Sequence, residues 1–234
     1  MTIPVSTLYE IELVAPGNSS HKHPGVRIIG KFELKKGQKI TAALGQQGSS
    51  EYCGSGGSFL VLEREEGQKT LLIAGGAGFA EIIRDFDEEF ACGNIKQTAK
   101  GNENVGTSGK QQFLTGDKED IYCAGAGFYE APQVSNLAEG CVAPKSYKEG
   151  LTGGKGVGRD GRVTEGGFGG GGGCYWRGLL KVYYGAGGGF TGGSTREGEE
   201  GECYGGGAGS FSADKGARFD HKFVKYGYCQ IKKL

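Results

Sequence analysis

Several features that mark common protein classes are scarce in this sequence of 234 residues. The charges balance, with 27 Lys and Arg against 27 Asp and Glu, so the chain carries no formal net charge at pH 7. This balance argues against binding to nucleic acid or to an anionic membrane by bulk electrostatics. No apolar run approaches the roughly 20 residues that cross a bilayer, so no membrane insertion is predicted. The first residues, MTIPVSTLYEIELV, lack a basic segment followed by an apolar core, and no signal peptide is visible in them.

The motifs of common catalytic and cofactor sites are also absent. The sequence contains no GxxxxGK[ST] phosphate-binding loop and no GxSxG nucleophile elbow. Residues 156–161 and 187–192 fit GxGxxG, but neither match opens a helix after a strand, and chance matches are expected in a glycine-rich chain. His21 and His23 belong to a set of only three histidines with no cysteine near them, which predicts a surface loop and no metal site. We therefore predict that the protein is not an enzyme and uses no cofactor.

The cysteines are widely and irregularly spaced. They are Cys53, Cys92, Cys123, Cys141, Cys174, Cys203 and Cys229. None forms a CxxC pair, which argues against a zinc ribbon or a redox motif. Disulfides with one cysteine left over are typical of an extracellular domain, and buried thiols are the alternative. Asn18 opens a glycosylation sequon, which adds weak support for an extracellular or secreted protein.

Both ends of the chain show the patterns of short β-strands. In TLYEIELV (7–14) the apolar residues Tyr9, Ile11 and Leu13 alternate with glutamates, as in a half-buried strand. GVRIIGKFEL (25–34) and KITAAL (39–44) flank a glycine-bearing turn and predict a hairpin, and SFLVLE and KTLLIA repeat this design. HKFVKYGYCQIKKL predicts one final strand with a bulge at Gly227. Such strands indicate a mainly β protein with an antiparallel sandwich.

The middle of the chain is less regular. FAEIIRDFDEEFACG (79–93) places apolar residues on one helical stripe and predicts one short α-helix that ends at Gly93. Residues 94–165 are polar, dotted with glycine and weakly periodic, so we expect loops there.

Glycine is the most abundant feature, with 49 residues against 5 prolines. A flexible linker is one interpretation, but linkers carry few aromatic residues, whereas this chain has 12 Phe and 11 Tyr, several of them inside glycine runs. We therefore predict ordered structure. Helices of the polyproline II type can hydrogen-bond side by side when no Cβ holds them apart, so a bundle of them needs glycine almost everywhere. The candidate runs are Gly75–Gly78, Gly125–Gly127, Gly153–Gly158, Gly166–Gly173, Gly185–Gly189 and Gly205–Gly209.

Four segments carry a resemblance to a known family. GVRIIGKFELKKGQKITAALGQQG, GGSFLVLEREEGQKTLLIAGGAG, GGFGGGGGC…GAGGGFTGG and GGGAGSF…YGYCQI follow one another over nearly the whole chain. In order and approximate spacing they resemble the glycine-rich extracellular region of the anaplastic lymphoma kinase and leukocyte tyrosine kinase receptors. The resemblance implies a TNF-like β-sandwich interrupted by a bundle of polyglycine II helices, and binding of a protein ligand outside the cell. Related glycine-rich modules occur in adhesive proteins that grip surface glycans.

These observations predict two parts of the chain. We expect residues 1–74 and 210–234 to form the sandwich, and residues 75–209 to form the inserted glycine-rich bundle with its loops. The glycines predicted to be structural are Gly169, Gly170, Gly171, Gly172, Gly187, Gly188 and Gly189.

The candidate binding residues lie in CYWRGLLKVYYG (174–185), between two glycine runs. They are Tyr175, Trp176, Arg177, Tyr183 and Tyr184, chosen because Trp, Tyr and Arg dominate binding hot spots. One alternative is that this segment simply packs as a hairpin against the rest of the protein. We expect a non-enzymatic extracellular module that binds a protein ligand, and the alternative function is a glycan-binding adhesive or structural protein.

Overall fold

The computed structural model describes residues 1–19, 23–80, 88–109, 123–132, 137–177, 181–197 and 203–234, which are mainly β with antiparallel sheets. The first large sheet has the order β13 (Arg218–Lys222), β2 (Gly25–Leu34), β1 (Thr7–Val14), β14 (Tyr228–Lys233). The second has the order β12 (Phe211–Ser212), β5 (Gly67–Ala74), β4 (Ser58–Arg64), β3 (Ile40–Ala43). All neighbouring strands within these two sheets are antiparallel.

Smaller elements lie between β5 and β12 in the sequence. A mixed sheet has the order β10 (Thr195–Glu197), β11 (Cys203–Gly205), β9 (Lys181–Tyr183), β8 (Tyr175–Arg177), with β11 and β9 parallel. A two-stranded sheet pairs β6 (Lys155–Val157) with β7 (Val163–Glu165), and the short 3-10 helices are η1 (Glu88–Phe90) and η2 (Tyr147–Glu149). The two large sheets thus draw all their strands from residues 7–74 and 211–233.

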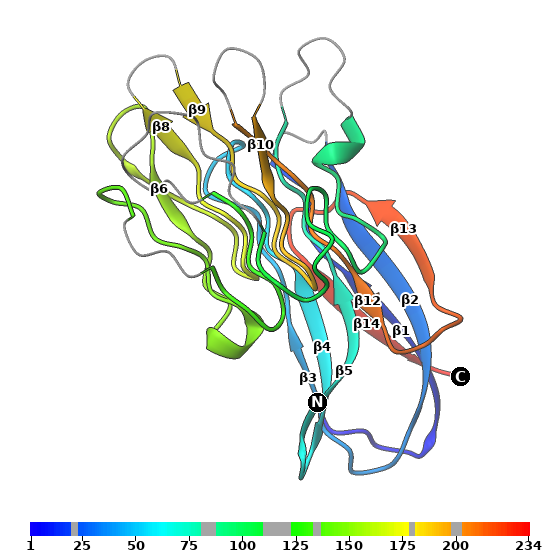
Figure 1. Ribbon diagram of the computed structural model, residues 1–234. Helices are drawn as coiled ribbons and strands as arrows, with labels where there is room; N and C mark the ends of the chain where they lie inside the picture. Colours follow the sequence, from blue (N-terminus) through cyan, green and yellow to red (C-terminus); the bar gives the residue numbers. More distant parts are fainter. Residues whose placement is uncertain (20–22, 81–87, 110–122, 133–136, 178–180, 198–202) are drawn as a thin grey trace.

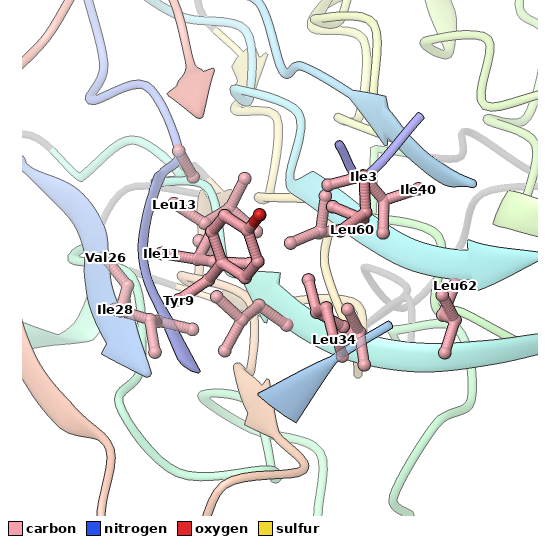
Figure 2. Close-up of a cluster of buried hydrophobic side chains, with 14 residues drawn as sticks. Ile3, Tyr9, Ile11, Leu13, Val26, Ile28, Leu34, Ile40, Leu60 and Leu62 are labelled. Carbon is pink, nitrogen blue, oxygen red and sulfur yellow. The ribbon is translucent and has the colours of Figure 1, made fainter. Parts of the chain in front are cut away.

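The main apolar core lies between the two large sheets, which is consistent with a β-sandwich (Figure 2). The alternation predicted for residues 7–14 is confirmed, because Tyr9, Ile11 and Leu13 are buried. Ile28 of β2 and Leu72 of β5 are fully buried in the same cluster. Removing this apolar surface from water drives the association of the two sheets.

Only one of the two predicted hairpins is confirmed. β4 and β5 pair antiparallel up to Arg64 and Gly67, so two residues connect them. β2 and β3 belong to different sheets, and the prediction of a hairpin from them was wrong. The turn between them is present, with Gly37 at a φ of 87°, but it carries the chain across the core. A turn signal marks where a strand ends and does not identify its partner.

The C-terminal segment also differs from its prediction. It forms two strands, β13 and β14, on opposite edges of one sheet, and not one strand with a bulge. Gly227 lies just before β14, where its N–H donates to the carbonyl of Gly45 at 2.9 Å. A Cβ on Gly227 would lie 2.2 Å from the hydroxyl oxygen of Ser58, so this crossing needs a glycine for close approach.

Two predictions for the middle of the chain need comment. Residues 81–87 of the helix predicted over 79–93 lie outside the described residues, and Glu88–Phe90 forms a 3-10 turn. The prediction of loops for 94–165 missed β6 and β7, which pair around the turn at Gly161. Three-residue strands are too short to show a period in the sequence.

The glycine runs pass side by side as extended traces between the two large sheets and the mixed sheet (Figure 1). The run 166–173 is divided by a turn, in which Gly169 and Gly170 have φ angles of 106° and 82°. Cys53–Gly57, which lies outside the predicted runs, is also hydrogen-bonded into this region.

Candidate functional site

Residues 185–190 show how the glycine-rich segments are held. Their backbone N–H groups donate to three neighbouring segments in turn, and donors three residues apart reach acceptors three residues apart on the same neighbour. The six bonds, 2.8–3.3 Å long, run from Gly185 to Tyr52, Ala186 to Cys123, Gly187 to Gly206, Gly188 to Ser55, Gly189 to Ala126 and Phe190 to Gly209. This segment therefore satisfies its amides through neighbours on three sides, without belonging to a β-sheet.

At many glycines of these segments the contacts leave no room for a side chain. A Cβ on Gly172 would lie 1.9 Å from the carbonyl oxygen of Cys123, and one on Gly188 would lie 2.1 Å from that of Gly169. The obstacle is backbone in each case, so it cannot turn aside as a flexible side chain does. Close approach thus requires glycine at these positions.

The segment 171–174 leads into β8, and the segment 184–187 follows β9. These two strands form the hairpin that carries the candidate binding residues (Figure 1). In this hairpin Trp176 is opposite Val182, and Arg177 pairs through its backbone with Lys181. Leu179 and Leu180, between the two strands in the sequence, lie outside the described residues. The ends of the hairpin are therefore fixed by the hydrogen-bonded glycine segments.

Four of the five predicted binding residues divide between two clusters. Trp176 packs with Tyr184 on a cluster that includes Phe79, whereas Tyr175 packs with Tyr183 on a cluster of cysteines and Ala138. Alternation along β8 accounts for the separation of Tyr175 from Trp176, since successive side chains point to opposite faces. The candidates do not form one surface.

Tyr183 and Tyr184 are each only 2% exposed. Tyr184 stacks on Tyr204 with ring centroids 5.5 Å apart, and Tyr183 makes an edge contact with Tyr175 at 6.2 Å. For Tyr183 and Tyr184 the structure therefore contradicts the expectation of an accessible contact surface. The hairpin packs against the rest of the protein on both faces, and this covers both rings.

Trp176 lies at the edge of an open cleft and is the chain's only tryptophan. The cleft has a volume of about 440 Å³ and is lined by Ser50, Tyr52, Gly158, Arg159, Asp160, Thr164 and Trp176. Tyr52 contacts the Trp176 ring edge-on with centroids 5.7 Å apart. The Arg159 guanidinium lies 5.9 Å from the Trp176 ring centroid, within the range of a cation–π contact.

Sequence reasoning missed the polar side of this cleft. Arg159 and Asp160 come from the turn between β6 and β7, in a segment predicted to be loop. Asp160 accepts the N–H of Arg162 at 3.1 Å, which fixes the turn. The signal in the sequence was the charged run GRDGR around a turn glycine, but nothing in it indicates that Trp176 is its neighbour.

Two cysteines lie directly behind the cleft. The sulfur atoms of Cys53 and Cys174 are 2.6 Å apart, and the Ser50 hydroxyl is 3.3 Å from the first and 3.4 Å from the second. The Thr164 hydroxyl donates to the backbone carbonyl of Cys174 at 2.5 Å. Contact with Cys174 lowers the pKa of the Cys53 thiol to about 7, while that same contact and burial raise the pKa of Cys174.

No protein-family model matches this chain, and a comparison with curated proteins finds no match. Among the described residues, no helix is long and apolar enough to span a membrane. No group of three or more His, Cys, Asp or Glu residues suited to holding a metal ion is found in that same part of the chain.

Proposed function

We propose that the glycine segments are polyglycine II helices bundled beside a TNF-like sandwich, as in the glycine-rich receptor region that the sequence resembles. The three-residue repeat of hydrogen bonds from residues 185–190 supports this, because helices of this type have three residues per turn. Such a bundle holds the ends of its loops in fixed positions. Loops that are already ordered lose less entropy when they bind a partner.

We propose further that the protein is a non-enzymatic extracellular module whose cleft at Trp176 anchors a protein ligand. The observation that carries this proposal is the position of Trp176, which is partly exposed at a concave site while its hairpin is held at both ends. Tryptophan is among the residues most enriched at binding hot spots, where the bound partner removes it from water. A ligand side chain entering the cleft would meet the Trp176 ring, Arg159 and Asp160.

Binding of a surface glycan is the second candidate, and the composition of the cleft favours it specifically. Trp176 and Tyr52 supply aromatic surface on which the apolar face of a sugar ring can pack. Asp160 can accept hydrogen bonds from sugar hydroxyls, and the Thr164 and Ser50 hydroxyls line the same cleft.

The test compares wild-type protein with the variant Trp176→Ala on a glycan array and on immobilised proteins secreted by the source organism. The matched control is Tyr226→Ala, which removes an aromatic residue that is 61% exposed outside the cleft. We expect Trp176→Ala to weaken binding by at least about 30-fold, the usual hot-spot threshold of about 2 kcal/mol, and the control to bind normally. Equal binding by wild type and both variants would place the contact surface elsewhere.

A further inference from the structure

Cys53 and Cys174 are closer than two separate thiols can lie. Their sulfur atoms are 2.6 Å apart, which is too short for a non-bonded contact and longer than the about 2.0 Å of a covalent disulfide. Both residues are 0% exposed, so they face each other inside the protein. Their surroundings hold them in this position, since the Ser50 hydroxyl reaches both sulfurs and Thr164 holds the Cys174 carbonyl.

The two cysteines belong to segments 121 residues apart in the sequence. Cys53 follows Tyr52 and opens the segment 53–57, whereas Cys174 ends a glycine run two residues before Trp176. Beside the sulfurs, the N–H of Gly54 donates to the carbonyl of Gly172 at 2.9 Å. The pair therefore lies where the two aromatic walls of the cleft meet.

We propose that Cys53 and Cys174 form a disulfide that joins the Tyr52 and Trp176 walls of the cleft. The bond itself stands on the geometry of the pair, and only its purpose, to keep the cleft in shape for a ligand, rests on the proposed function. In the chain-entropy description, a disulfide stabilises a protein mainly by lowering the conformational entropy of the unfolded chain. This effect grows with the number of residues between the two cysteines.

The bond forms by exchange with an oxidant that is itself a disulfide, such as oxidised glutathione. The Cys53 thiolate attacks the oxidant, forming a mixed disulfide and releasing one thiol; the Cys174 thiolate then attacks the Cys53 sulfur and releases the second. Two electrons pass to the oxidant, and the two protons lost by the cysteines appear on the two released thiols. Because both sulfurs are buried, the exchange takes place during folding.

The direct test is peptide mapping of wild-type protein refolded with oxidised glutathione, alkylated in denaturant without reductant, and digested. We expect one peptide pair linked through Cys53 and Cys174, two hydrogens lighter than the separate peptides. Native protein should keep this link in dithiothreitol and lose it only when denaturant is added. Alkylation of both cysteines, or linkage of either one to a different cysteine, would overturn the inference. Because the mapping uses wild-type protein, it does not depend on the folding of a variant.

A second measurement compares melting temperatures. The test protein is a double variant that carries both Cys53→Ser and Cys174→Ser, and the control is the single variant Cys229→Ser. We expect the double variant to melt about 5–10 °C below oxidised wild type, and the control to melt with wild type. Equal melting of the double variant and oxidised wild type would count against a covalent link. If the disulfide is present but Trp176→Ala binds the ligand as tightly as wild type, the proposed function is rejected and this inference is not. Absence of the link with binding that still depends on Trp176 would reject this inference alone.

Discussion

At the scale of single residues, the glycines in contact with backbone are the least replaceable part of the molecule. Gly216, in an exposed turn, has only an ordinary contact where a Cβ would stand. At Gly172 the same atom would lie 1.9 Å from a carbonyl oxygen. The composition alone therefore predicted that glycine matters, but only the contacts separate the structural glycines from the tolerant ones.

Gly172→Ala should strongly destabilise the protein because its methyl group has no free volume beside the Cys123 carbonyl. We expect a loss of about 3 kcal/mol or more in the free energy of unfolding, as for other severe overpacking. Gly216→Ala is the matched control, since the nearest atom to its Cβ is the Asp214 carboxylate at 3.5 Å. Chemical denaturation measures both variants, and equal stability of the two would show that Gly172 is not closely packed.

A second prediction at this scale concerns acid. Glu12 of β1 accepts hydrogen bonds from Tyr228 on the adjacent strand β14 and, at 3.2 Å, from Lys222 on β13, which lies beyond β2 in the same sheet. Burial acts to raise the pKa of Glu12, but these hydrogen bonds and the Lys222 charge outweigh it and lower the pKa below its ordinary value of 4.5. A lowered folded-state pKa stabilises the protein above the unfolded value, and this stabilisation is lost as the pH falls through the folded pKa.

Glu12→Gln should therefore remove part of the acid sensitivity. We expect it to lower stability at pH 7 by about 1 kcal/mol or less, and to lose less stability than wild type between pH 6 and pH 3. Glu65→Gln, in the β4–β5 turn, is the control. Urea denaturation at each pH gives the comparison, and parallel pH profiles of wild type and Glu12→Gln would contradict the assignment.

At the scale of elements, sequence patterns found the long strands and the β4–β5 hairpin but missed the other connections. Strands β1, β4 and β5 carry enough alternating or apolar residues to be recognised. The partner of β2 was not predictable, because its turn at Gly37 is equally compatible with a hairpin and with a crossing between sheets. The mixed sheet was missed because each of its strands has only three residues and depends on the adjoining glycine segments for its position.

The same limit applies to the candidate site. Trp176 was identified from its residue type and its place beside a glycine run, and the structure puts it at a cleft. The burial of Tyr184 and the approach of Arg159 depend on which segments lie beside the hairpin. That arrangement follows from the hydrogen-bond register of the glycine segments. Because glycine has no side chain, the sequence of a glycine run contains no pattern from which this register could be predicted.

Hydrogen exchange tests the glycine segments as elements. The amides of Gly76, Gly172 and Gly188 donate to backbone carbonyls at 2.8–2.9 Å and are buried. We expect them to exchange as slowly as the amides of β4, within about tenfold, because both are released only by extensive unfolding. The comparison amide is that of Gly161, which makes a local bond to the Gly158 carbonyl at 3.0 Å in an exposed turn, so it should exchange fast. If the amides of Gly172 and Gly188 exchanged as fast as the amide of Gly161, the glycine runs would be flexible linkers and the prediction of ordered structure would be wrong.

At the scale of the whole molecule, backbone hydrogen bonds join the glycine segments to the large sheets. Val26 of β2 donates to the carbonyl of Gly75 at 3.0 Å, and the N–H of Gly75 donates to the Ser210 hydroxyl at 2.9 Å. Gly93 donates to the carbonyl of Pro24 at 3.0 Å. Separating the two regions would leave these buried groups without partners, which costs about 1–3 kcal/mol for each.

We therefore expect the chain to unfold as one cooperative unit. Two probes follow the two regions separately, since Trp176 fluorescence reports on the glycine segments and far-ultraviolet circular dichroism is dominated by the large sheets. Thermal unfolding of wild type should give coincident transitions by both probes and equal calorimetric and van't Hoff enthalpies. Leu72→Ala, in the sandwich core, should lower stability by about 2–5 kcal/mol and shift both probes together, and Gly172→Ala should do the same from the other region. A variant that shifts only the probe of its own region would show that the sandwich and the glycine segments are independent folding units.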